Sequence, residues 1–150
     1  MEPTLIFMFG PPAAGKTTYS TAYCKTYPGF VRISADEIRQ DLYGSQDIYG
    51  DPETIYKLLL AKMRDVLQSG RNVIYDATNL RKDWRMDYMD ALSDIECRKI
   101  IRVLPIDRET ARKRHEARGR NIPWSDLDPF FDRMEFPTQD EGWDKIEVVL

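Results

Sequence analysis

Two hydrophobic periods alternate along this chain of 150 residues and predict strands that alternate with helices. Short apolar runs predict five strands, over residues 5–9, 29–33, 72–75, 98–104 and 146–149. Apolar positions at helical spacing, together with glycines that end helices, predict helices over residues 17–27, 35–43, 52–69, 81–94, 107–118 and 122–136. The segment 44–51 contains two glycines and precedes a proline, so it is a predicted loop.

This alternation predicts the α/β class, with a parallel sheet of about five strands covered by helices on both faces, a three-layer sandwich. The length fits one domain with one core, so residues 1–150 are expected to form a single domain. Ligands of such sheets bind at the carboxyl ends of the strands, and the functional residues are expected there.

The composition is ordinary for a soluble protein, with 42% hydrophobic residues, 31% charged residues and a net charge of −3. No apolar run approaches the roughly 20 residues of a membrane span, and the first residues lack the basic start of a signal peptide. Two cysteines without close spacing predict thiols in a reducing compartment, so the expected location is the cytoplasm. A single histidine argues against a zinc site.

The small net charge conceals a strong asymmetry along the chain. Residues 98–120 contain nine Lys or Arg and three Asp or Glu, whereas residues 121–150 contain two and eight. Such segregation indicates a face built for anionic ligands, although a solvated helix face would also explain the basic segment.

A phosphate-binding loop of the form G-x-x-x-x-G-K-[ST] follows the first predicted strand and precedes a predicted helix. Its residues are Gly10, Pro11, Pro12, Ala13, Ala14, Gly15, Lys16 and Thr17, and the contact region extends to Thr18. The glycines let backbone N–H groups turn toward phosphate oxygens, Lys16 supplies a positive charge, and the Thr17 hydroxyl can ligate Mg²⁺. Ala13 stands where many such loops carry a third glycine, which restricts the backbone there. The loop predicts a site for ATP and Mg²⁺.

The segment after the second strand pairs a carboxylate with a guanidinium. Asp36 and Arg39 are three residues apart on one helix face, where Asp36 can act as a general base and Arg39 can hold a phosphate of the acceptor. The plainer interpretation is a capping box between Ser34 and Glu37 with an acidic first turn.

Polar residues also follow the third strand. Asp76 can orient Thr17 or a metal-bound water, while Thr78 and Asn79 offer neutral hydrogen bonds to a substrate. A turn-forming aspartate and a helix-capping asparagine are the structural alternative.

The basic helix predicts a lid over residues 107–123. Arg114 and Arg118 are four residues apart on one face, and an arginine from a lid stabilises charge on a transferring phosphoryl group. His115, on the same helix, is expected at the helix surface rather than in catalysis.

These pieces together resemble the kinase domain of 5′-polynucleotide kinases, particularly the bacteriophage type, within the P-loop kinase superfamily. The resemblance covers most of residues 4–123 and is carried by the loop, the Asp36 and Arg39 pair, residues 76–80 and residues 114–119. It implies that Lys16 and Thr17 bind the ATP phosphates and Mg²⁺, and that Arg118 acts on those phosphates from the lid.

The same resemblance implies the acceptor. Asp36 would be the general base on a 5′-hydroxyl of DNA or RNA, and Arg39 would hold the acceptor's 3′-phosphate. Bifunctional members of the family continue into a phosphatase domain, which these 150 residues lack, so a separate phosphatase or ligase would be the partner enzyme. The sequence leaves the choice between DNA and RNA, and the oligomeric state, open.

Two other functions remain compatible with the sequence. A kinase for a small molecule, or for a modified base such as hydroxymethyluracil in DNA, would use the same loop and base. An ATP-driven switch would hydrolyse ATP without a phosphorylated product. The short length and the absence of an acidic pair at the end of a hydrophobic strand disfavour the switch.

Overall fold

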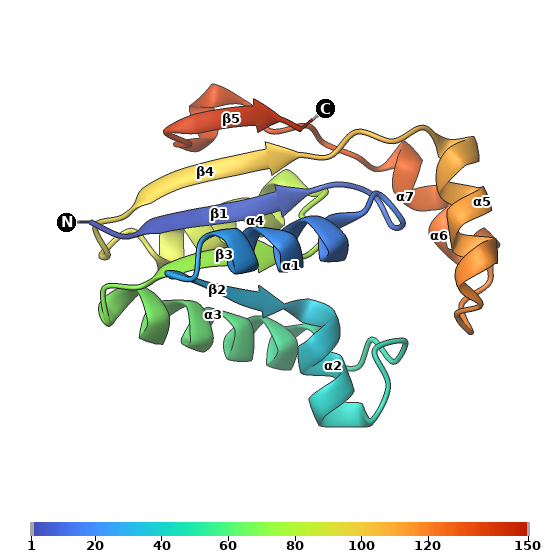
Figure 1. The fold of residues 1–150 in the computed structure, drawn as a ribbon, viewed down its shortest axis with the longest axis horizontal. Helices are drawn as coiled ribbons and strands as arrows, with labels where there is room; N and C mark the ends of the chain where they lie inside the picture. The colour runs from blue at the N-terminus through green and yellow to red at the C-terminus, as the bar shows by residue number, and fades with distance from the viewer. Residues whose placement is uncertain (1, 150) are drawn as a thin grey trace.

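The computed structural model describes residues 2–149 and contains one five-stranded parallel sheet (Figure 1). Its strands are β1 (Thr4–Phe9), β2 (Phe30–Ser34), β3 (Asn72–Asp76), β4 (Arg98–Val103) and β5 (Lys145–Val148). Their order across the sheet is β2-β3-β1-β4-β5, and every neighbouring pair is parallel. The predicted α/β class and the five strands are confirmed.

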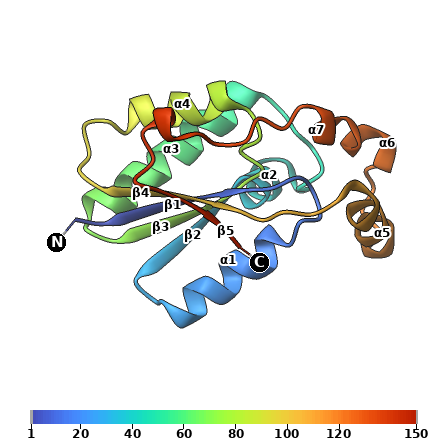
Figure 2. The same cartoon turned by 90° about the horizontal axis from the view of Figure 1, so that it is seen from above.

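Helices cover both faces of this sheet (Figure 2). α1 (Lys16–Thr26) lies on one face, and α3 (Pro52–Gln68) and α4 (Lys82–Ala91) lie on the other. α2 (Ala35–Tyr43) follows β2 directly. Three further helices, α5 (Arg108–Arg118), α6 (Trp124–Leu127) and α7 (Pro129–Asp132), lie beyond the carboxyl ends of the strands. Among residues 2–149, no helix is long and apolar enough to cross a membrane.

The central strand explains why its sequence is an unbroken apolar run. Leu5, Phe7 and Phe9 pack into the core with α3 and α4, whereas Ile6 and Met8 face α1. All five side chains are at most 1% exposed. A strand buried on both faces needs no alternation with polar residues, and it fixes the loop that follows it.

Side-chain caps set where the helices begin. The Ser34 hydroxyl accepts a hydrogen bond from the Glu37 backbone N–H at 3.3 Å, so α2 begins directly at the end of β2. Only this half of the expected capping box forms, because the Glu37 carboxylate pairs with Arg32 instead. Asp107 caps α5, and its carboxylate accepts a hydrogen bond from the Thr110 N–H at 2.8 Å.

The prediction of one helix over residues 122–136 is wrong. The structure has two short helices there, α6 and α7, and residues 133–136 lie outside both. Pro129 is the first residue of α7, and a proline lacks the N–H that would continue the preceding helix. The proline therefore divides the segment.

The prediction that His115 lies at the surface is also wrong. Its side chain is only 4% exposed, and its Nε2 lies 2.5 Å from the Ile122 carbonyl oxygen. The Trp124 ring centroid lies 5.9 Å from that of the imidazole. His115 therefore joins α5 to the turn that leads into α6.

Candidate active site

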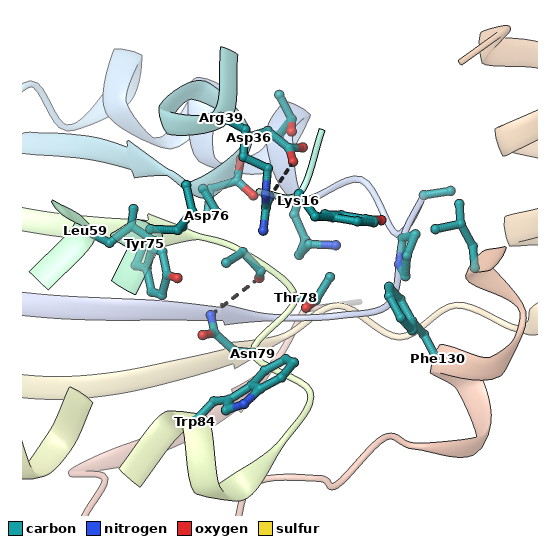
Figure 3. A pocket seen from close by; sticks show the side chains of 18 of the residues that line it. Lys16, Asp36, Arg39, Leu59, Tyr75, Asp76, Thr78, Asn79, Trp84 and Phe130 are labelled. Atoms are coloured by element: carbon teal, nitrogen blue, oxygen red, sulfur yellow. Dashed lines mark hydrogen bonds and ion pairs between the residues drawn. The ribbon is translucent and has the colours of Figure 1, made fainter. Parts of the chain in front are cut away.

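A cavity of about 1730 Å³ opens at the carboxyl ends of the strands (Figure 3). Ligand pockets in proteins commonly occupy roughly 300–1,000 Å³, so this cavity has room for two ligands side by side. The phosphate-binding loop and the lid line one end, which we call the donor end. α3, α4 and the end of β3 line the other end, which we call the acceptor end. Figure 3 shows Phe130 at the donor end and Leu59 with Tyr75 at the acceptor end.

The first residue of the phosphate-binding loop lies between the segments that follow β3 and β4. The Gly10 N–H donates to the Thr78 carbonyl at 3.2 Å, and a Cβ at Gly10 would lie 3.1 Å from the Leu104 carbonyl oxygen. Gly15, at φ 94°, adopts the left-handed conformation directly before α1. Ala13 also has a positive φ, of 70°, at the position where the sequence departs from the glycine of many such loops. The loop therefore forms without that glycine, at the cost of backbone strain.

The Lys16 side chain is buried against the phosphate-binding loop. Its side chain is 9% exposed, and Nζ donates to the Pro11 carbonyl at 2.8 Å. Burial lowers the pKa of Lys16 to about 8, although the negative charges of Asp76 and Asp36 act in the opposite direction. The charge of Lys16 therefore changes with pH near physiological values, around pH 8. An anion bound in the loop would favour the protonated form.

Thr17 and Thr18 lie in the first turn of α1 and line the same cavity as Lys16. A helix N-terminus favours bound anions because its first N–H groups and its dipole face them. Within residues 2–149, no three His, Cys, Asp or Glu side chains form a ready-made metal cluster. Proteins commonly hold Mg²⁺ through one or two side chains, waters and the phosphates of the substrate. Thr17 and Asp76 both line the cavity and carry oxygen atoms of the kind that could hold such an ion.

Asp76 is held firmly by one of its two carboxylate oxygens. Its Oδ2 accepts hydrogen bonds from the Ser20 hydroxyl at 3.1 Å and from Nε and Nη2 of Arg32 at 3.2 and 2.6 Å. Asp76 is 6% exposed and lines the cavity. The arrangement orients the carboxylate beside Lys16 and leaves Oδ1 without a hydrogen bond from residues 2–149.

Asp36 and Arg39 meet as their spacing predicts. Arg39 Nη1 donates to Asp36 Oδ1 at 3.1 Å, and both side chains line the cavity between its two ends (Figure 3). The guanidinium carbon of Arg39 lies 5.1 Å from the centre of the Tyr49 ring, a cation–π distance. The Arg39 Nε is buried and has no hydrogen-bond partner within residues 2–149. The Arg39 Nη2 also makes no hydrogen bond within residues 2–149 and is not a buried atom, so it is the donor that Arg39 keeps available for a ligand.

The lid contacts the loop through its arginines. Arg114 Nη1 donates to the Ala13 carbonyl at 3.3 Å, and Arg118 lines the cavity. The charges of Arg118 and Arg120 both act to lower the pKa of Lys16, so they lie within reach of it. Arg120 itself pairs with Asp47 in the loop between α2 and α3. The donor end therefore gathers four cations, on the loop and on the lid.

Thr78 and Asn79 lie at the cavity wall, but Asn79 has a structural partner. Its Nδ2 donates to the Met8 carbonyl at 2.6 Å, and its backbone has a positive φ of 50°. Thr78 contributes its carbonyl to Gly10 and its side chain to the cavity lining. The amide nitrogen of Asn79 is thus engaged with the central strand rather than turned to the cavity.

Sequence reasoning missed a buried ion pair that supports the cavity wall. Arg85 Nε and Nη2 donate to the two Glu141 oxygens at 2.8 and 2.9 Å, and both side chains are 0% exposed. Arg85 Nη1 also donates to the Asn79 carbonyl at 2.8 Å, while Trp143 Nε1 donates to Glu141 at 3.0 Å. No local pattern could reveal this pair, because 56 residues separate its partners. The role of Arg32 could have been suspected from the sequence, because Arg32 is the only charged residue inside the predicted strand over residues 29–33.

Comparison with known proteins agrees with this geometry. Residues 5–137 match the family described as AAA domain. An L-seryl-tRNA(Sec) kinase from Methanococcus maripaludis (strain DSM 14266) is 23% identical over 150 residues, which cover 97% of this chain and 58% of that protein. The chain therefore spans little more than half the length of this curated relative.

Two solved structures illustrate the range of the fold. One chain of the Pnkp1/Rnl/Hen1 RNA repair complex aligns with a TM-score of 0.78 and 25% identity, over 88% of this chain and 44% of that chain. A gluconokinase from Sinorhizobium meliloti 1021 aligns with a TM-score of 0.63 and 19% identity, over 98% of this chain and 82% of that chain, a likeness of fold alone. Since the family match takes in the loop, the lid and four of the five strands, β1 to β4, this chain belongs to the AAA domain family and has the P-loop kinase fold, with polynucleotide-kinase-like relatives.

Proposed function

We propose that this protein transfers the γ-phosphate of ATP to the 5′-hydroxyl of a nucleic acid, with Asp36 as the general base. The observation that carries the proposal is the position of Asp36. It lies in the one cavity that Lys16 and Thr17 also line, at the boundary between the donor end and the acceptor end. A carboxylate there is within the reach of an acceptor hydroxyl and faces the loop that binds the phosphates.

In the proposed reaction, the acceptor hydroxyl gives its proton to an Asp36 carboxylate oxygen as it attacks the γ-phosphorus. A new oxygen–phosphorus bond forms, the bond between the γ-phosphorus and the bridging oxygen breaks, and ADP leaves with the electron pair. Lys16 and Arg118 stabilise the negative charge on the phosphate oxygens. Mg²⁺, held by Thr17 with Asp76 beside it, would neutralise further charge on the phosphates.

The nucleic-acid acceptor is supported by Arg39 and by one relative. The Arg39 Nη2 makes no hydrogen bond within residues 2–149 and, unlike Nε, is not a buried atom, so it is available to a phosphate of the acceptor. The alignment with a chain of an RNA repair complex at 25% identity favours the same class of acceptor.

A kinase for a small molecule is the second candidate, because no Lys or Arg of residues 2–149 lines the acceptor end, and the cation beside it is Arg39 at the boundary between the two ends. A long phosphate backbone would meet little positive charge there. A modified base such as hydroxymethyluracil in DNA is a separate alternative, which would use the same loop and the same base but does not share this charge argument.

The test is transfer of label from γ-labelled ATP with Mg²⁺ to a panel of acceptors. The panel contains 5′-hydroxyl DNA, 5′-hydroxyl RNA, a 3′-nucleotide, free nucleosides and hydroxymethyluracil DNA. Label at a 5′ end is the expected result. Label on a free nucleoside or on the modified base alone would replace the proposed acceptor, and ATP hydrolysis without any transfer would contradict the kinase proposal. Arg39→Ala is expected to weaken acceptors with a 3′-phosphate more than those without.

A further inference from the structure

The acceptor end has a floor of tyrosines. The ring centres of Tyr56 and Tyr88 lie 4.8 Å apart, and those of Tyr75 and Tyr88 lie 5.3 Å apart. Leu59 completes this floor at 2% exposure. Trp84 projects from α4 at the mouth of the cavity with 51% of its surface exposed (Figure 3). Aromatic side chains arranged in this way suit a flat ring as a ligand.

One hydrogen-bond donor in this floor has no partner. The hydroxyls of Tyr75 and Tyr88 lie 3.3 Å apart, so one donates to the other. Each carries one proton, and a single hydrogen bond between them uses only one of the two. No other acceptor for these hydroxyls occurs within residues 2–149, and the side chains are 4% and 5% exposed. Burial raises the pKa of Tyr75 to about 12, so this hydroxyl stays protonated at neutral pH. A buried hydroxyl thus faces the cavity with a proton to donate.

The rim of the acceptor end is acidic. Glu53 on α3 and Asp87 and Asp90 on α4 line it, and all three are exposed. Ionised carboxylates are hydrogen-bond acceptors only, so they suit amino groups and repel phosphates. The acidic rim offers hydrogen-bond acceptors, and the tyrosine floor offers a hydrogen-bond donor. A ring that fits this end would therefore donate hydrogen bonds at its outer edge and accept one at its inner end.

We propose that the acceptor end binds an amino-bearing heterocyclic ring, such as cytosine or adenine, which carries no phosphate of its own. A ring atom accepts the hydrogen bond from the Tyr75 and Tyr88 pair, and the exocyclic amino group donates to Glu53 and Asp87. This inference deepens the proposed function, on which it rests, because it makes the terminal nucleobase a determinant of the acceptor. Phosphates of the acceptor then stay near Arg39, outside the acidic rim.

The test is equilibrium binding of cytidine and uridine by titration calorimetry. The protein is first saturated with Mg²⁺ and a non-hydrolysable ATP analogue, so that the nucleosides compete only for the acceptor end. Cytidine, with its amino group, is expected to bind about tenfold more tightly than uridine, the usual size of one good base contact. Equal affinities, or tighter binding of uridine, would overturn the inference.

Variants connect this preference to the rim. Removal of both acids in Glu53→Ala/Asp87→Ala is expected to reduce the preference for cytidine to about twofold or less. Asp65→Ala is the matched control, since Asp65 is also an exposed acid on α3 but is not part of the cavity lining. Equal preferences in the double variant and in the wild type would count against the assigned role of the rim. Circular dichroism of each variant verifies that the fold is intact.

The binding measurement is independent of phosphoryl transfer. If no 5′-hydroxyl receives label but cytidine still binds selectively, the proposed function fails and the inference stands. If transfer occurs and both nucleosides bind alike, the inference fails and the proposed function stands.

Discussion

The two ends of the cavity are lined by side chains of opposite chemistry. The donor end gathers Lys16 and the lid arginines Arg114, Arg118 and Arg120 around a backbone loop. The acceptor end has an aromatic floor and three carboxylates at its rim. Under the two proposals above, phosphate would be bound by charge and backbone, whereas the acceptor would be selected by shape, stacking and hydrogen bonds.

The two ends also differ in how the chain builds them. The donor loop is one contiguous segment, residues 10–17, and its first residue donates a backbone hydrogen bond to Thr78 in the segment after β3. The acceptor end draws its side chains from α3, α4 and β3, and a buried ion pair with the segment before β5 supports its wall. A contiguous site can be recognised from sequence, and an assembled one depends on the fold.

The largest effect is expected at the boundary between the ends. Asp36→Asn should lower kcat by about 10²–10⁴, the usual contribution of a general base, because Asn cannot take the proton. ATP binding, which belongs to the donor end, should change little. Steady-state kinetics with the best acceptor measure both parameters. Asp41→Asn on the same helix is the control, because Asp41 is exposed and does not line the cavity. A wild-type kcat for Asp36→Asn would remove Asp36 from the mechanism.

The next effect concerns the wall of the acceptor end. Glu141→Gln should lower the free energy of unfolding by about 3–5 kcal/mol, because it leaves the buried Arg85 charge without a counter-charge. Asp83→Asn, which removes half of the exposed pair with Arg81, should cost under about 1 kcal/mol. Urea unfolding of the three proteins gives these values. Similar losses in both variants would mean that burial does not set the energy of the Arg85 pair.

The third prediction concerns the donor end alone, where the affinity for nucleotide should depend on pH. The pKa of Lys16 in the free protein is about 8, below its ordinary value, and phosphate binding favours the protonated amine. Nucleotide affinity should therefore be constant at lower pH and fall as pH rises through about 8, to roughly a tenth at pH 9. Titration of the ATP analogue between pH 7 and 9 measures this, and Lys16→Met should bind weakly with a flat profile. A flat profile for the wild type would contradict the role of Lys16 as a titrating phosphate ligand.

The pKa of Lys16 also affects the stability of the fold, with a definite sign. The folded-state pKa lies below the unfolded value, so the unfolded chain binds more protons between about pH 8 and the ordinary lysine pKa of 10.5. The contribution of Lys16 to stability therefore becomes more favourable as pH rises through that window.

The smallest effect concerns the strain in the donor loop. Ala13→Gly removes a side chain from the left-handed conformation and should raise the free energy of unfolding by up to about 1 kcal/mol. Ala14 is the neighbouring residue and does not have a positive φ. The Ala14→Gly substitution should therefore lower the free energy of unfolding by about 0.5–1 kcal/mol. Thermal unfolding of both variants compares the two positions. A loss in Ala13→Gly as large as in Ala14→Gly would show that the strain at Ala13 is negligible.

Much of the fold could be predicted because its signals are local. The apolar run before Gly10, the glycine-ended helices and the strand spacing each depend on neighbouring residues. The one helix expected over residues 122–136 failed at Pro129, where a proline divides it. The prediction that His115 lies at the surface was wrong because the burial of His115 depends on the turn at Ile122, which hydrophobic periodicity does not describe.

The contacts of the candidate site also fall into two groups, those that follow from local spacing and those that depend on the fold. The contact between Asp36 and Arg39 follows from helical spacing, and the structure has it at 3.1 Å. The Asn79 side chain, in the segment after β3, donates to Met8 of β1, and Arg32 of β2 donates to Asp76 of β3. Such contacts depend on strand order, which a single sequence does not specify.

The Arg85 and Glu141 pair also limits how the protein can change. A loss of either partner alone leaves one buried charge, whereas replacement of both by apolar side chains of similar volume is often neutral or stabilising. The charged and the apolar versions of this wall are therefore two stable alternatives separated by unstable single variants. Across descendants of this sequence, the two positions are expected to be inherited as a unit, although 56 residues lie between them.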